Sequence, residues 1–309
     1  MIYIVVLNWN SDQDTVKCIK SLLNLKCINE FRIVICDNDS KVESFQKIEN
    51  YLKMEHADKT ISLNERDIDS FKVSNEKIIL IKNNENYGYA GGNNIGLKLA
   101  MMQDGMQYAW VLNNDTEVDK DALTALVEKM LSDAHIGLCG SRLVEMETKY
   151  KVQALGGTIN PWFCTTREIG SDLTITDIVN EEEWEEKIDF VVGASLFFSR
   201  FCLEKVGLLC EDYFLYYEEI DYCNRIKQNN LKIGIASKSI VFHEQGASTD
   251  KGKSKIADFC SIKNRVLISK KFYKSYTLFV RISLFGVAIN RSFRKQFDRI
   301  PSILHLIIK

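Results

Sequence analysis

The sequence predicts an α/β fold with an open, twisted and mostly parallel sheet that carries helices on both faces. Short apolar runs alternate with segments of helical spacing through the first half of the chain, which is typical of a doubly wound sheet. The first run, Ile2–Leu7, is continuously apolar, as expected for a strand covered on both sides. The 309 residues, 46% of them hydrophobic, can bury a sizeable core.

The predicted elements follow in order along the chain. Strands are expected at Ile2–Leu7, Phe31–Cys36, Ile78–Ile81, Tyr108–Leu112 and Ile136–Cys139, and helices at Asp12–Leu25, Asn94–Met102 and Asp121–Leu131. The polar segment Lys53–Glu76 is interpreted as a helix end and a surface excursion. Further on, Val152–Ile169 is expected to form loops or short strands, Asp189–Phe198 a strand, Tyr217–Gln228 a helix, and Leu231–Ala236 and Ile240–Phe242 strands. This pattern predicts one domain over residues 1–255 and a helical tail over residues 256–309.

Composition excludes several classes of protein. The formal net charge of −2 gives no reason to expect a nucleic-acid partner. Nine cysteines, an odd number without CxxC spacing, disfavour a disulfide framework or a zinc site and favour a reducing, cytoplasmic location. The first residues lack the basic region and cleavage site of a signal peptide, and no segment has the roughly 20 apolar residues that span a bilayer.

The first four predicted strands end in polar segments, at the edge where ligands bind in open parallel sheets. The candidate ligand contacts there are Leu7, Asn8 and Asn10 after the first strand, Asp37 after the second, Asn86, Gly91 and Asn94 after the third, and Asn113, Asn114 and Asp115 after the fourth. Taken singly, such residues are also ordinary turn and cap formers. Four segments at one edge predict a crevice for a polar ligand.

A glycine cluster follows the third strand and precedes a predicted helix. Gly88, Gly91 and Gly92 allow backbone to approach a ligand closely, and the helix start offers free N–H groups. The spacing matches neither GxxxxGK[ST] nor GxGxxG, which disfavours a nucleotide hydrolase and a dinucleotide enzyme.

Asp115 directly follows the apolar strand Tyr108–Leu112. A carboxylate at that place can hold Mg²⁺ or Mn²⁺, with substrate phosphates completing the coordination shell. The alternative is a cap for the helix near Asp121, a role that Asp119 would serve better. We therefore expect a divalent metal at Asp115.

Three carboxylates lie within four positions at a predicted helix start: Glu218, Glu219 and Asp221. Such crowding is costly unless a cation or a reacting proton uses it, although acidic residues also favour a helix start through the dipole. Asp221 stands one helical turn before Arg225, so these two are expected to share a face. His243 ends a predicted strand, before Gly246, Ser248 and Thr249. A lone histidine is more often structural, but this placement makes His243 a candidate metal or phosphate contact.

Eight segments carry a more specific signal because they occur in a fixed order over residues 2–272. They are LNWN at 7–10, CDNDS at 36–40, NYGYAGGNN at 86–94, LNNDTEVD at 112–119, VVGASLFFSR at 191–200, VGLLCEDYFLYYEEIDYCNR at 206–225, VFHEQGAST at 241–249 and KNR at 263–265. In these segments the chain resembles the family 2 glycosyltransferases of the GT-A fold, and within them the bacterial rhamnosyltransferase-like branch.

The resemblance implies a role for each matching position. Asn8 and Asp37 would contact the nucleoside of a nucleoside-diphosphate sugar, and the Asn86–Asn94 loop would line the donor pocket. Asn113 and Asp115 stand at the divalent-metal signature, with Asp115 as the ligand. Gly193, Ala194 and Tyr217 would shape the acceptor side. Glu219 would be the catalytic base, Arg225 would face the pyrophosphate, and His243 would approach the metal or phosphate.

Two positions depart from the family pattern. Asn113 replaces the first acid of an Asp-x-Asp motif, and Glu219 replaces the usual Asp, which leaves the base open between Glu219, Glu218 and Asp221. The implied reaction is a direct displacement at the anomeric carbon, with inversion and without a covalent enzyme intermediate. A nucleotidyltransferase and an inactive nucleotide-sugar-binding protein are the alternatives. dTDP-rhamnose is the first expected donor and a UDP-sugar the second, with a glycan as acceptor in surface polysaccharide synthesis.

The tail after residue 269 is basic and rich in apolar residues. Its charged residues are Lys270, Lys271, Lys274, Arg281, Arg291, Arg294, Lys295, Arg299 and Lys309 against one acid, Asp298. Basic amphipathic segments suit the surface of an anionic membrane, where a lipid-linked acceptor would be met. The alternative is that its apolar face packs on its own domain or on a second subunit as a homodimer.

Overall fold

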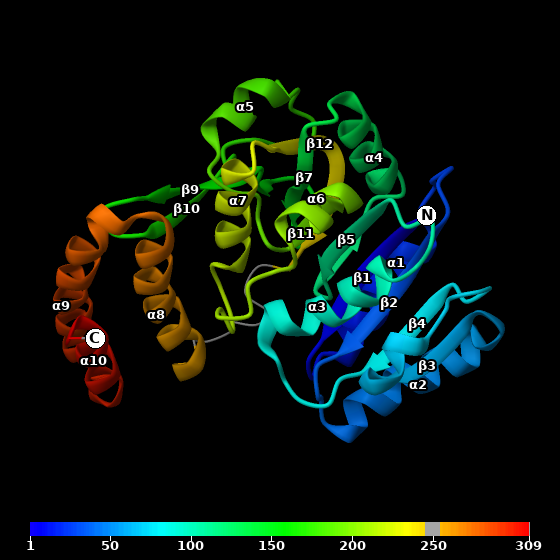
Figure 1. The fold of residues 1–309 in the computed structure, drawn as a ribbon, viewed down its shortest axis with the longest axis horizontal. Helices are drawn as coiled ribbons and strands as arrows, with labels where there is room; N and C mark the ends of the chain where they lie inside the picture. Colours follow the sequence, from blue (N-terminus) through cyan, green and yellow to red (C-terminus); the bar gives the residue numbers. More distant parts are fainter. Residues whose placement is uncertain (245–253, 309) are drawn as a thin grey trace.

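The computed structural model describes residues 1–244 and 254–308 of the chain. Within this part, ten strands form one mixed, mostly parallel sheet in the order β3-β4-β2-β1-β5-β11-β7-β12-β6, with β8 beside β7 (Figure 1). The strands of this sheet are β1 Ile2–Asn8, β2 Phe31–Asp37, β3 Thr60–Asn64, β4 Ile78–Lys82, β5 Tyr108–Asn113, β6 Thr116–Val118, β7 Ile136–Glu145, β8 Val152–Ala154, β11 Ser195–Ser199 and β12 Lys232–His243. The predicted fold class is confirmed.

Helices cover both faces of the sheet, and a separate hairpin extends from it. The hairpin consists of β9 Gly156–Asn160 and β10 Thr165–Ile169, which pair antiparallel. The helices are α1 Asp12–Leu23, α2 Val42–Glu55, α3 Gly88–Met101, α4 Ala122–Ser132, α5 Glu181–Lys187, α6 Arg200–Val206, α7 Glu218–Gln228, α8 Lys255–Phe272, α9 Thr277–Phe293 and α10 Ile300–Ile308, with short 3₁₀ segments at Ala57–Lys59, Glu65–Ser70, Lys274–Tyr276 and Phe297–Arg299.

Alternate side chains of β1 point to opposite faces of the sheet and so contribute to two layers of core. Ile2, Ile4 and Val6 face one side, where they join side chains of α1, α2 and α4. Tyr3 and Val5 face the other side, where α3, α6 and α7 pack. Because both faces are buried, the strand has no polar position before Asn8. The sequence therefore passes directly from buried core to the polar edge of the sheet.

Helix α3 begins six residues earlier than predicted, so the glycine cluster lies inside its first turns rather than before it. A Cβ on Gly92 would lie 2.5 Å from Leu7 Cδ1, and a Cβ on Gly96 would lie 2.6 Å from Val5 Cγ1. These glycines therefore let α3 pack closely against β1. Gly88 has a φ of +70°, and a Cβ there would meet the carbonyl oxygen of Phe214, so this position requires glycine.

Three further boundaries differ from the prediction. The segment expected as the strand Asp189–Phe198 is a strand only from Ser195, because Asp189 turns back to accept a hydrogen bond from the Ile159 N–H at 2.9 Å. The two strands expected after residue 230 form one strand, β12, with an irregular register between Ala236 and Ile240. The polar segment Lys53–Glu76 contains an edge strand, β3, which its composition does not reveal.

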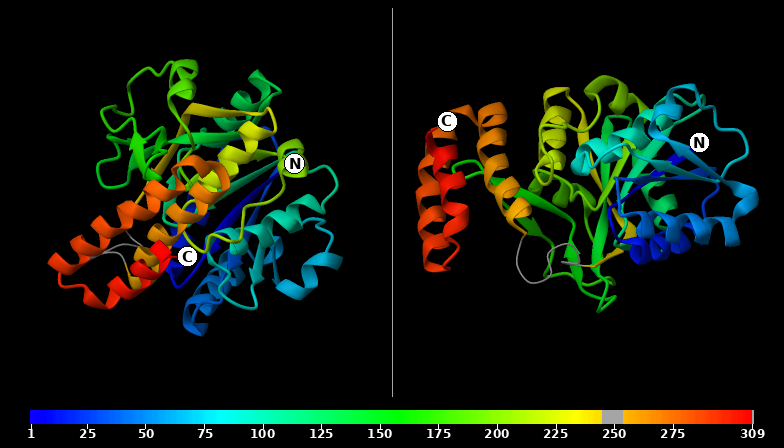
Figure 2. Two further views of the ribbon diagram at one scale, coloured as in Figure 1. Left: turned by 60° about the vertical axis from the view of Figure 1, so that its left-hand side comes forward. Right: turned by 90° about the horizontal axis from the view of Figure 1, so that it is seen from below.

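The helical tail is present, and its first helix is part of the domain core. Ile262 and Val266 of α8, with Val280 and Leu284 of α9, belong to the same buried cluster as α3, α6 and α7. Figure 2 shows α8 lying nearest to the sheet domain, with α9 and α10 outside it. No helix among the described residues is long and apolar enough to cross a bilayer.

Candidate active site

The carboxyl ends of β1 and β2 are joined by a buried hydrogen-bonded cluster. The Asn8 amide donates to Asp37 Oδ2 at 2.6 Å and to Ser40 Oγ at 3.0 Å, while the Ser40 N–H donates to Asp37 Oδ1 at 3.0 Å. Asn10 lies beside them, since its N–H donates to Ser40 Oγ at 2.9 Å. The structure thus brings Asn8, Asn10 and Asp37 together, as expected from parallel neighbouring strands.

A second amide cluster connects β2, β4 and α3 through Asn38. Its Oδ1 accepts from the Asn83 amide and from the Tyr87 N–H, and its Nδ2 donates to Asn86 Oδ1 at 2.9 Å and to Gly88 O at 3.0 Å. Asn38 is 2% exposed, so these bonds fix the turn that carries the glycine cluster. Asn86 therefore lies within this turn, bonded to Asn38 and to the Gly88 N–H.

Two residues predicted to line the donor pocket have other partners. Asn94 is buried, donating from Nδ2 to Leu209 O at 2.9 Å and to Glu211 Oε1 at 2.8 Å, and accepting from the Leu209 N–H. Its amide therefore anchors the loop after α6 to α3. Gly91 faces the same side, since a Cβ there would lie 3.9 Å from Glu211 Cδ. The geometry assigns both to packing of α3.

Asp115 and His243 face one another at the end of β12. Asp115 Oδ1 lies 3.5 Å from His243 Nε2, and the two side chains are 11% and 14% exposed. Asp115 Oδ1 is buried and accepts no hydrogen bond in the described part of the chain. An anionic oxygen without a donor is costly to bury, so this position favours a cation.

The partners of His243 indicate which ring nitrogen is free. Gln153 Nε2 donates to Glu168 Oε2 at 3.3 Å, which leaves Gln153 Oε1 to accept from His243 Nδ1 at 2.9 Å. In the neutral imidazole, Nε2 then presents its lone pair to Asp115 Oδ1. Two acceptors that face each other favour a metal ion between them, and an orienting hydrogen bond at the other nitrogen is typical of metal-bound histidine.

The donor set fits a divalent metal. Carboxylate oxygens suit Mg²⁺ and Mn²⁺, and an imidazole nitrogen favours the transition ion of the two. No group of three or more histidine, cysteine or acidic side chains with metal-site geometry occurs among the described residues. Two protein ligands agree with a site that substrate phosphates complete. Asn113 and Asn114 adjoin it: the Asn113 N–H donates to Ala194 O at 3.0 Å, and the Asn114 amide donates to Thr15 Oγ1 at 2.9 Å.

Tyr89 connects this edge to the acidic helix. Its hydroxyl donates to Gly193 O, and burial raises its pKa well above the usual range, with the Glu218, Glu219 and Asp115 carboxylates adding to the effect. Gly193 also lies near the acidic pair, since a Cβ there would be 3.9 Å from Glu219 Cδ. The carboxylates of Asp115, Glu218 and Glu219 therefore act on one half-buried tyrosine, whose hydroxyl bonds to Gly193.

The two glutamates differ in surroundings. Glu218 is 3% exposed and its Oε2 has no hydrogen-bond partner among the described residues, whereas Glu219 is half-buried and lies toward Gly193 and Glu168. Burial raises the pKa of Glu219 to about 7. Burial and the adjacent Glu219 carboxylate raise the pKa of Glu218 well above its usual range. Glu219 is thus a carboxylate poised near neutral pH beside an open position.

The turn before α7 is strained and held by α8. Tyr216 and Tyr217 have φ angles of 72° and 77°, in the left-handed region that costs bulky residues energy. The Asn264 amide donates to the carbonyls of Leu215 and Tyr216 at 2.9 and 2.8 Å, and the Tyr217 hydroxyl donates to Cys164 O. These bonds fix the direction in which α7 presents Glu218 and Glu219.

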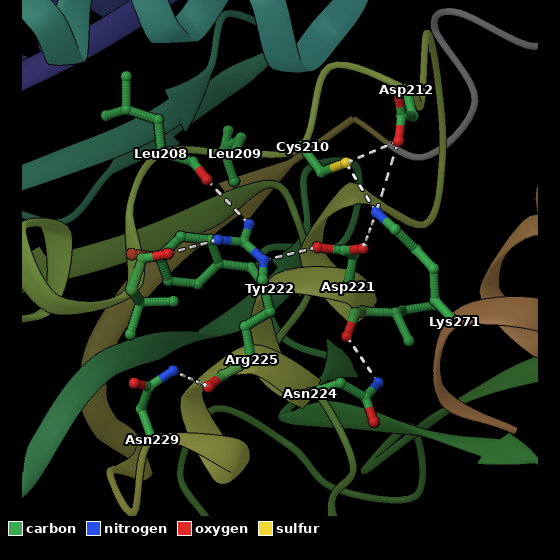
Figure 3. Close-up of polar contacts among 12 residues, drawn as sticks. Leu208, Leu209, Cys210, Asp212, Asp221, Tyr222, Asn224, Arg225, Asn229 and Lys271 are labelled. Carbon is green, nitrogen blue, oxygen red and sulfur yellow. Dashed lines mark hydrogen bonds and ion pairs between the residues drawn. The ribbon is translucent and has the colours of Figure 1, made fainter.

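Asp221 and Arg225 form a hydrogen-bonded group with Lys271 (Figure 3). Asp221 is fully buried between Arg225 Nε at 2.7 Å and Lys271 Nζ at 2.9 Å. The other two Arg225 nitrogens donate to Val206 O and Leu208 O, both at 2.8 Å. The predicted helical pairing is confirmed. The geometry, however, gives Arg225 protein partners where a pyrophosphate contact was expected, and it removes Asp221 from the candidate bases.

No role was predicted from the sequence for Tyr89, Asn38 or Asn264, although each lies in one of the eight segments that resemble the family. Their importance depends on partners distant in sequence, which no local pattern displays. Trp9, 58% exposed in the LNWN segment, was likewise not singled out. The predicted contribution of Ser248 and Thr249 lies outside the described residues.

Comparisons with known proteins show which family the chain resembles. A family model described as glycosyl transferase family 2 matches residues 3–206. The chain is 24% identical over 275 residues to the low-salt glycan biosynthesis hexosyltransferase Agl10 of Haloferax volcanii, covering 87% of this chain and 76% of that protein.

Solved structures share the fold. GalNAc-T7, crystallised with UDP, GalNAc and Mn²⁺, aligns with a TM-score of 0.65 at 16% identity over 90% of this chain, which spans about half (49%) of that protein. The mannosyltransferase PcManGT of Pyrobaculum calidifontis, in complex with GDP-Man and Mn²⁺, aligns with a TM-score of 0.57 at 10% identity over 100% of this chain and 86% of its own. The family model covers most of the chain, including the strand ends that carry Asp37 and Asp115, and the chain therefore belongs to the family 2 glycosyltransferases.

Proposed function

We propose that the chain is a metal-dependent, inverting glycosyltransferase that transfers a hexose from a nucleoside-diphosphate sugar to a hydroxyl of a glycan acceptor in surface polysaccharide synthesis. The observation that carries this proposal is that the carboxylates of Asp115 and Glu219 both act on the Tyr89 hydroxyl, while His243 lies 3.5 Å from Asp115. A carboxylate suited to a cation and a carboxylate whose pKa is about 7 thus act on the same hydroxyl group. The hexosyltransferase relative and the nucleotide-bound neighbours support the same class of reaction.

In the proposed reaction, Glu219 removes the proton of the acceptor hydroxyl as that oxygen attacks the anomeric carbon. The new C–O bond forms on the face opposite to the leaving nucleoside diphosphate, so the configuration inverts. Gly193 leaves room for the acceptor beside Glu219, because a side chain there would approach the carboxyl group. Asn8 and Asp37 are fully buried and bonded to each other, so in this proposal they hold in place the two strand ends that meet the nucleoside.

Asp115 and His243 would hold Mn²⁺ or Mg²⁺, which neutralises charge on the leaving pyrophosphate. The bound Mn²⁺ of GalNAc-T7 and PcManGT supports Mn²⁺ as the first choice. Asn113 and Asn114 lie at the same strand end and complete the polar wall of the donor site. We infer no role for Arg225 in this step, since its nitrogens already have protein partners.

A donor panel tests the proposed function directly. With Mn²⁺ present, the protein is expected to release nucleoside diphosphate from one nucleotide sugar, with dTDP-rhamnose tested first and UDP-sugars second. Phosphate analysis and proton NMR of the anomeric signal report the leaving group and the configuration of the product. Release of pyrophosphate would instead identify a nucleotidyltransferase. Binding without release, in the presence of a range of glycan acceptors, would identify an inactive binding protein.

We further propose that α9 and α10 attach the enzyme to the cytoplasmic face of an anionic membrane, where a lipid-linked acceptor is met. The exposed apolar residues of α9 recur at intervals of four, three, four and four positions, which places them on one side of the helix. They are Leu278, Ile282, Phe285, Ile289 and Phe293, and with the neighbouring Phe279 we call them the apolar face. Each of these six side chains is 45–85% exposed. Phe297, Leu304 and Ile308 are exposed beside α10 or on it.

Basic residues of the tail differ in their partners. Lys271 pairs with Asp221, and both Arg291 and Arg299 pair with Asp258 inside the protein. Lys274, Arg294 and Lys295 are exposed and have no carboxylate partner in the described part of the chain. They stand before and after α9, so basic charge brackets the apolar face. This arrangement is typical of a helix that lies in a membrane surface.

Liposome flotation tests the membrane proposal. The double variant Ile282→Gln/Ile289→Gln removes two exposed apolar side chains and is expected to reduce recovery with anionic liposomes by about tenfold or more. Ile28→Gln/Ile178→Gln is the matched control, because both isoleucines are fully exposed elsewhere on the protein. Equal flotation of the wild type and the double variant would contradict membrane attachment. A dimer that becomes monomeric in the double variant, without liposome binding by the wild type, would assign the face to self-association.

A further inference from the structure

A polar cavity lies between hairpin β9–β10, α8 and α9, apart from the donor edge. Its volume is ≈ 520 Å³, and its lining includes Thr166, Tyr217, Arg265, Ser283, Gly286 and Arg291. This size falls in the range of roughly 300–1,000 Å³ that small-molecule sites occupy. None of the donor-site residues described above lines it, so the cavity can receive a different part of the substrates.

The cavity carries excess positive charge. Asp258 accepts from Arg291 and also pairs with Arg299, so one carboxylate meets two guanidinium groups. Arg265 donates to Phe163 O at 2.9 Å and to Ser283 Oγ at 3.0 Å, and it has no carboxylate partner among the described residues. A guanidinium that bonds only neutral groups in a partly enclosed site attracts an anion, and its geometry suits phosphate.

Gly286 indicates that the cavity is kept open. Glycine within a helix costs about 1 kcal/mol relative to alanine, so it is expected where a side chain would clash. A Cβ on Gly286 would meet nothing within 4 Å, and its φ is not in the left-handed region. Neither packing nor backbone conformation therefore requires glycine at this position. The absence of a side chain at Gly286 leaves this wall of the cavity open.

The position of the cavity connects two parts of the proposed enzyme. On α9, the cavity residues Ser283, Gly286 and Asn290 each follow an exposed residue of the apolar face, namely Ile282, Phe285 and Ile289. One residue is a turn of about 100° around a helix, so the two sets form adjacent sides. At the other end, Tyr217 lines the cavity and is followed directly by Glu218 and Glu219.

We propose that this cavity binds a phosphate group of the acceptor substrate, with Arg265 providing the counter-charge. The hydrocarbon chain of such an acceptor would lie along the apolar face, and its sugar would reach Glu219. This inference rests on the proposed glycosyltransferase function and names the acceptor class: a glycan linked through phosphate to a lipid. Thr166 and Ser283 supply hydroxyl groups for the phosphate oxygens or the first sugar.

Calorimetric titration with farnesyl phosphate tests the cavity. The wild type is expected to bind farnesyl phosphate at least about tenfold more tightly than farnesol or inorganic phosphate, because only the first engages both sides of α9. Gly286→Trp fills the cavity and Arg265→Gln removes its unpaired charge, so each is expected to weaken binding by about tenfold or more. Gly286→Ala, which fills less space, should weaken binding less than Gly286→Trp.

Ser292→Trp is the control for bulk, since Ser292 is exposed on α9 outside the cavity lining and should leave binding unchanged. Thermal unfolding checks that each variant is folded. Equal affinity of all variants, absence of wild-type binding, or equal binding of farnesol and farnesyl phosphate would overturn the proposal. The donor panel is scored separately. Cavity binding without donor turnover would reject the proposed function alone, and donor turnover without cavity binding would reject the acceptor site alone.

Discussion

Glu219→Gln is expected to lower the rate of sugar transfer by about 10²–10⁴-fold, the usual contribution of a positioned general base. The substitution retains the size and shape of the side chain while removing the proton acceptor. Because Glu219 lies toward Gly193 on the acceptor side, binding of the nucleotide sugar should change little. Steady-state rates at saturating donor, together with calorimetric donor affinity, measure the two effects separately.

The pH dependence offers a second measurement of the same residue. A general base works in its deprotonated form, and burial raises the pKa of Glu219 to about 7. Transfer by the wild type should therefore rise as the pH increases through about 7 and then level off, as the base becomes ionised. The residual activity of Glu219→Gln should lack this rise. Because the Glu218 and Glu219 carboxylates are adjacent and repel each other, the observed midpoint reflects the ionisation of both.

Asp221 and Glu218 provide the comparisons. Asp221→Asn leaves Arg225 and Lys271 with a weakened buried partner, so it should lower the unfolding temperature more than Glu219→Gln does. If Glu219→Gln transfers sugar at close to the wild-type rate while Glu218→Gln is inactive and folded, the base is Glu218. If both glutamine variants are active, the acidic pair is not the catalytic base.

Asp115→Ala is expected to abolish transfer, with a fold that remains intact. The substitution removes the carboxylate whose Oδ1 has no hydrogen-bond donor in the described chain, so little native bonding is lost. Removing a charge from a site without a donor should also leave the unfolding temperature unchanged or higher. Circular dichroism and thermal unfolding measure the fold, and nucleoside-diphosphate release measures the chemistry.

Chelation should reproduce the loss in the wild type, and Mn²⁺ should restore activity better than Mg²⁺ because an imidazole nitrogen is among the proposed ligands. Asp104→Ala is the matched control, since Asp104 is an exposed acid in the loop after α3. Full activity in excess chelator would exclude a metal-dependent mechanism. Activity of Asp115→Ala at the wild-type level would exclude Asp115 as the essential ligand.

The local sequence determined where the apolar strands occur along the chain and which polar residues follow them. β1, β2, β4 and β5 are continuous apolar runs because both faces of each are buried, so their ends are visible as abrupt changes to Asn and Asp. Parallel neighbours then place those ends together, as Asn8 and Asp37 show. By contrast, β3 was not predicted, since an edge strand with exposed residues lacks an apolar signature.

Only the tertiary structure showed how the tail relates to the domain. The pattern of predicted strands and helices separated residues 256–309 as a helical tail, but α8 contributes Asn264 to the turn before Glu218 and Lys271 to buried Asp221. These contacts join positions about 50 residues apart in sequence. A helical segment that carries both an apolar stripe and polar anchors has the same local pattern whether it packs on its own domain or on a membrane.

The sequence by itself determined the fold class, the family resemblance and the set of polar residues from which the site is built. Those features depend on periodicity and on residue types at fixed spacing, which short-range physics dictates. Only the tertiary structure decided which members of that set meet: Glu219 faces Gly193, while Asp221 and Arg225 pair with other groups. Helix α7 carries Glu219 and Asp221 two positions apart, about 200° around its axis, so they necessarily face different surroundings. The surroundings of each face come from elements distant in sequence: α8 contributes Lys271 beside Asp221, and β10 contributes Glu168 toward Glu219.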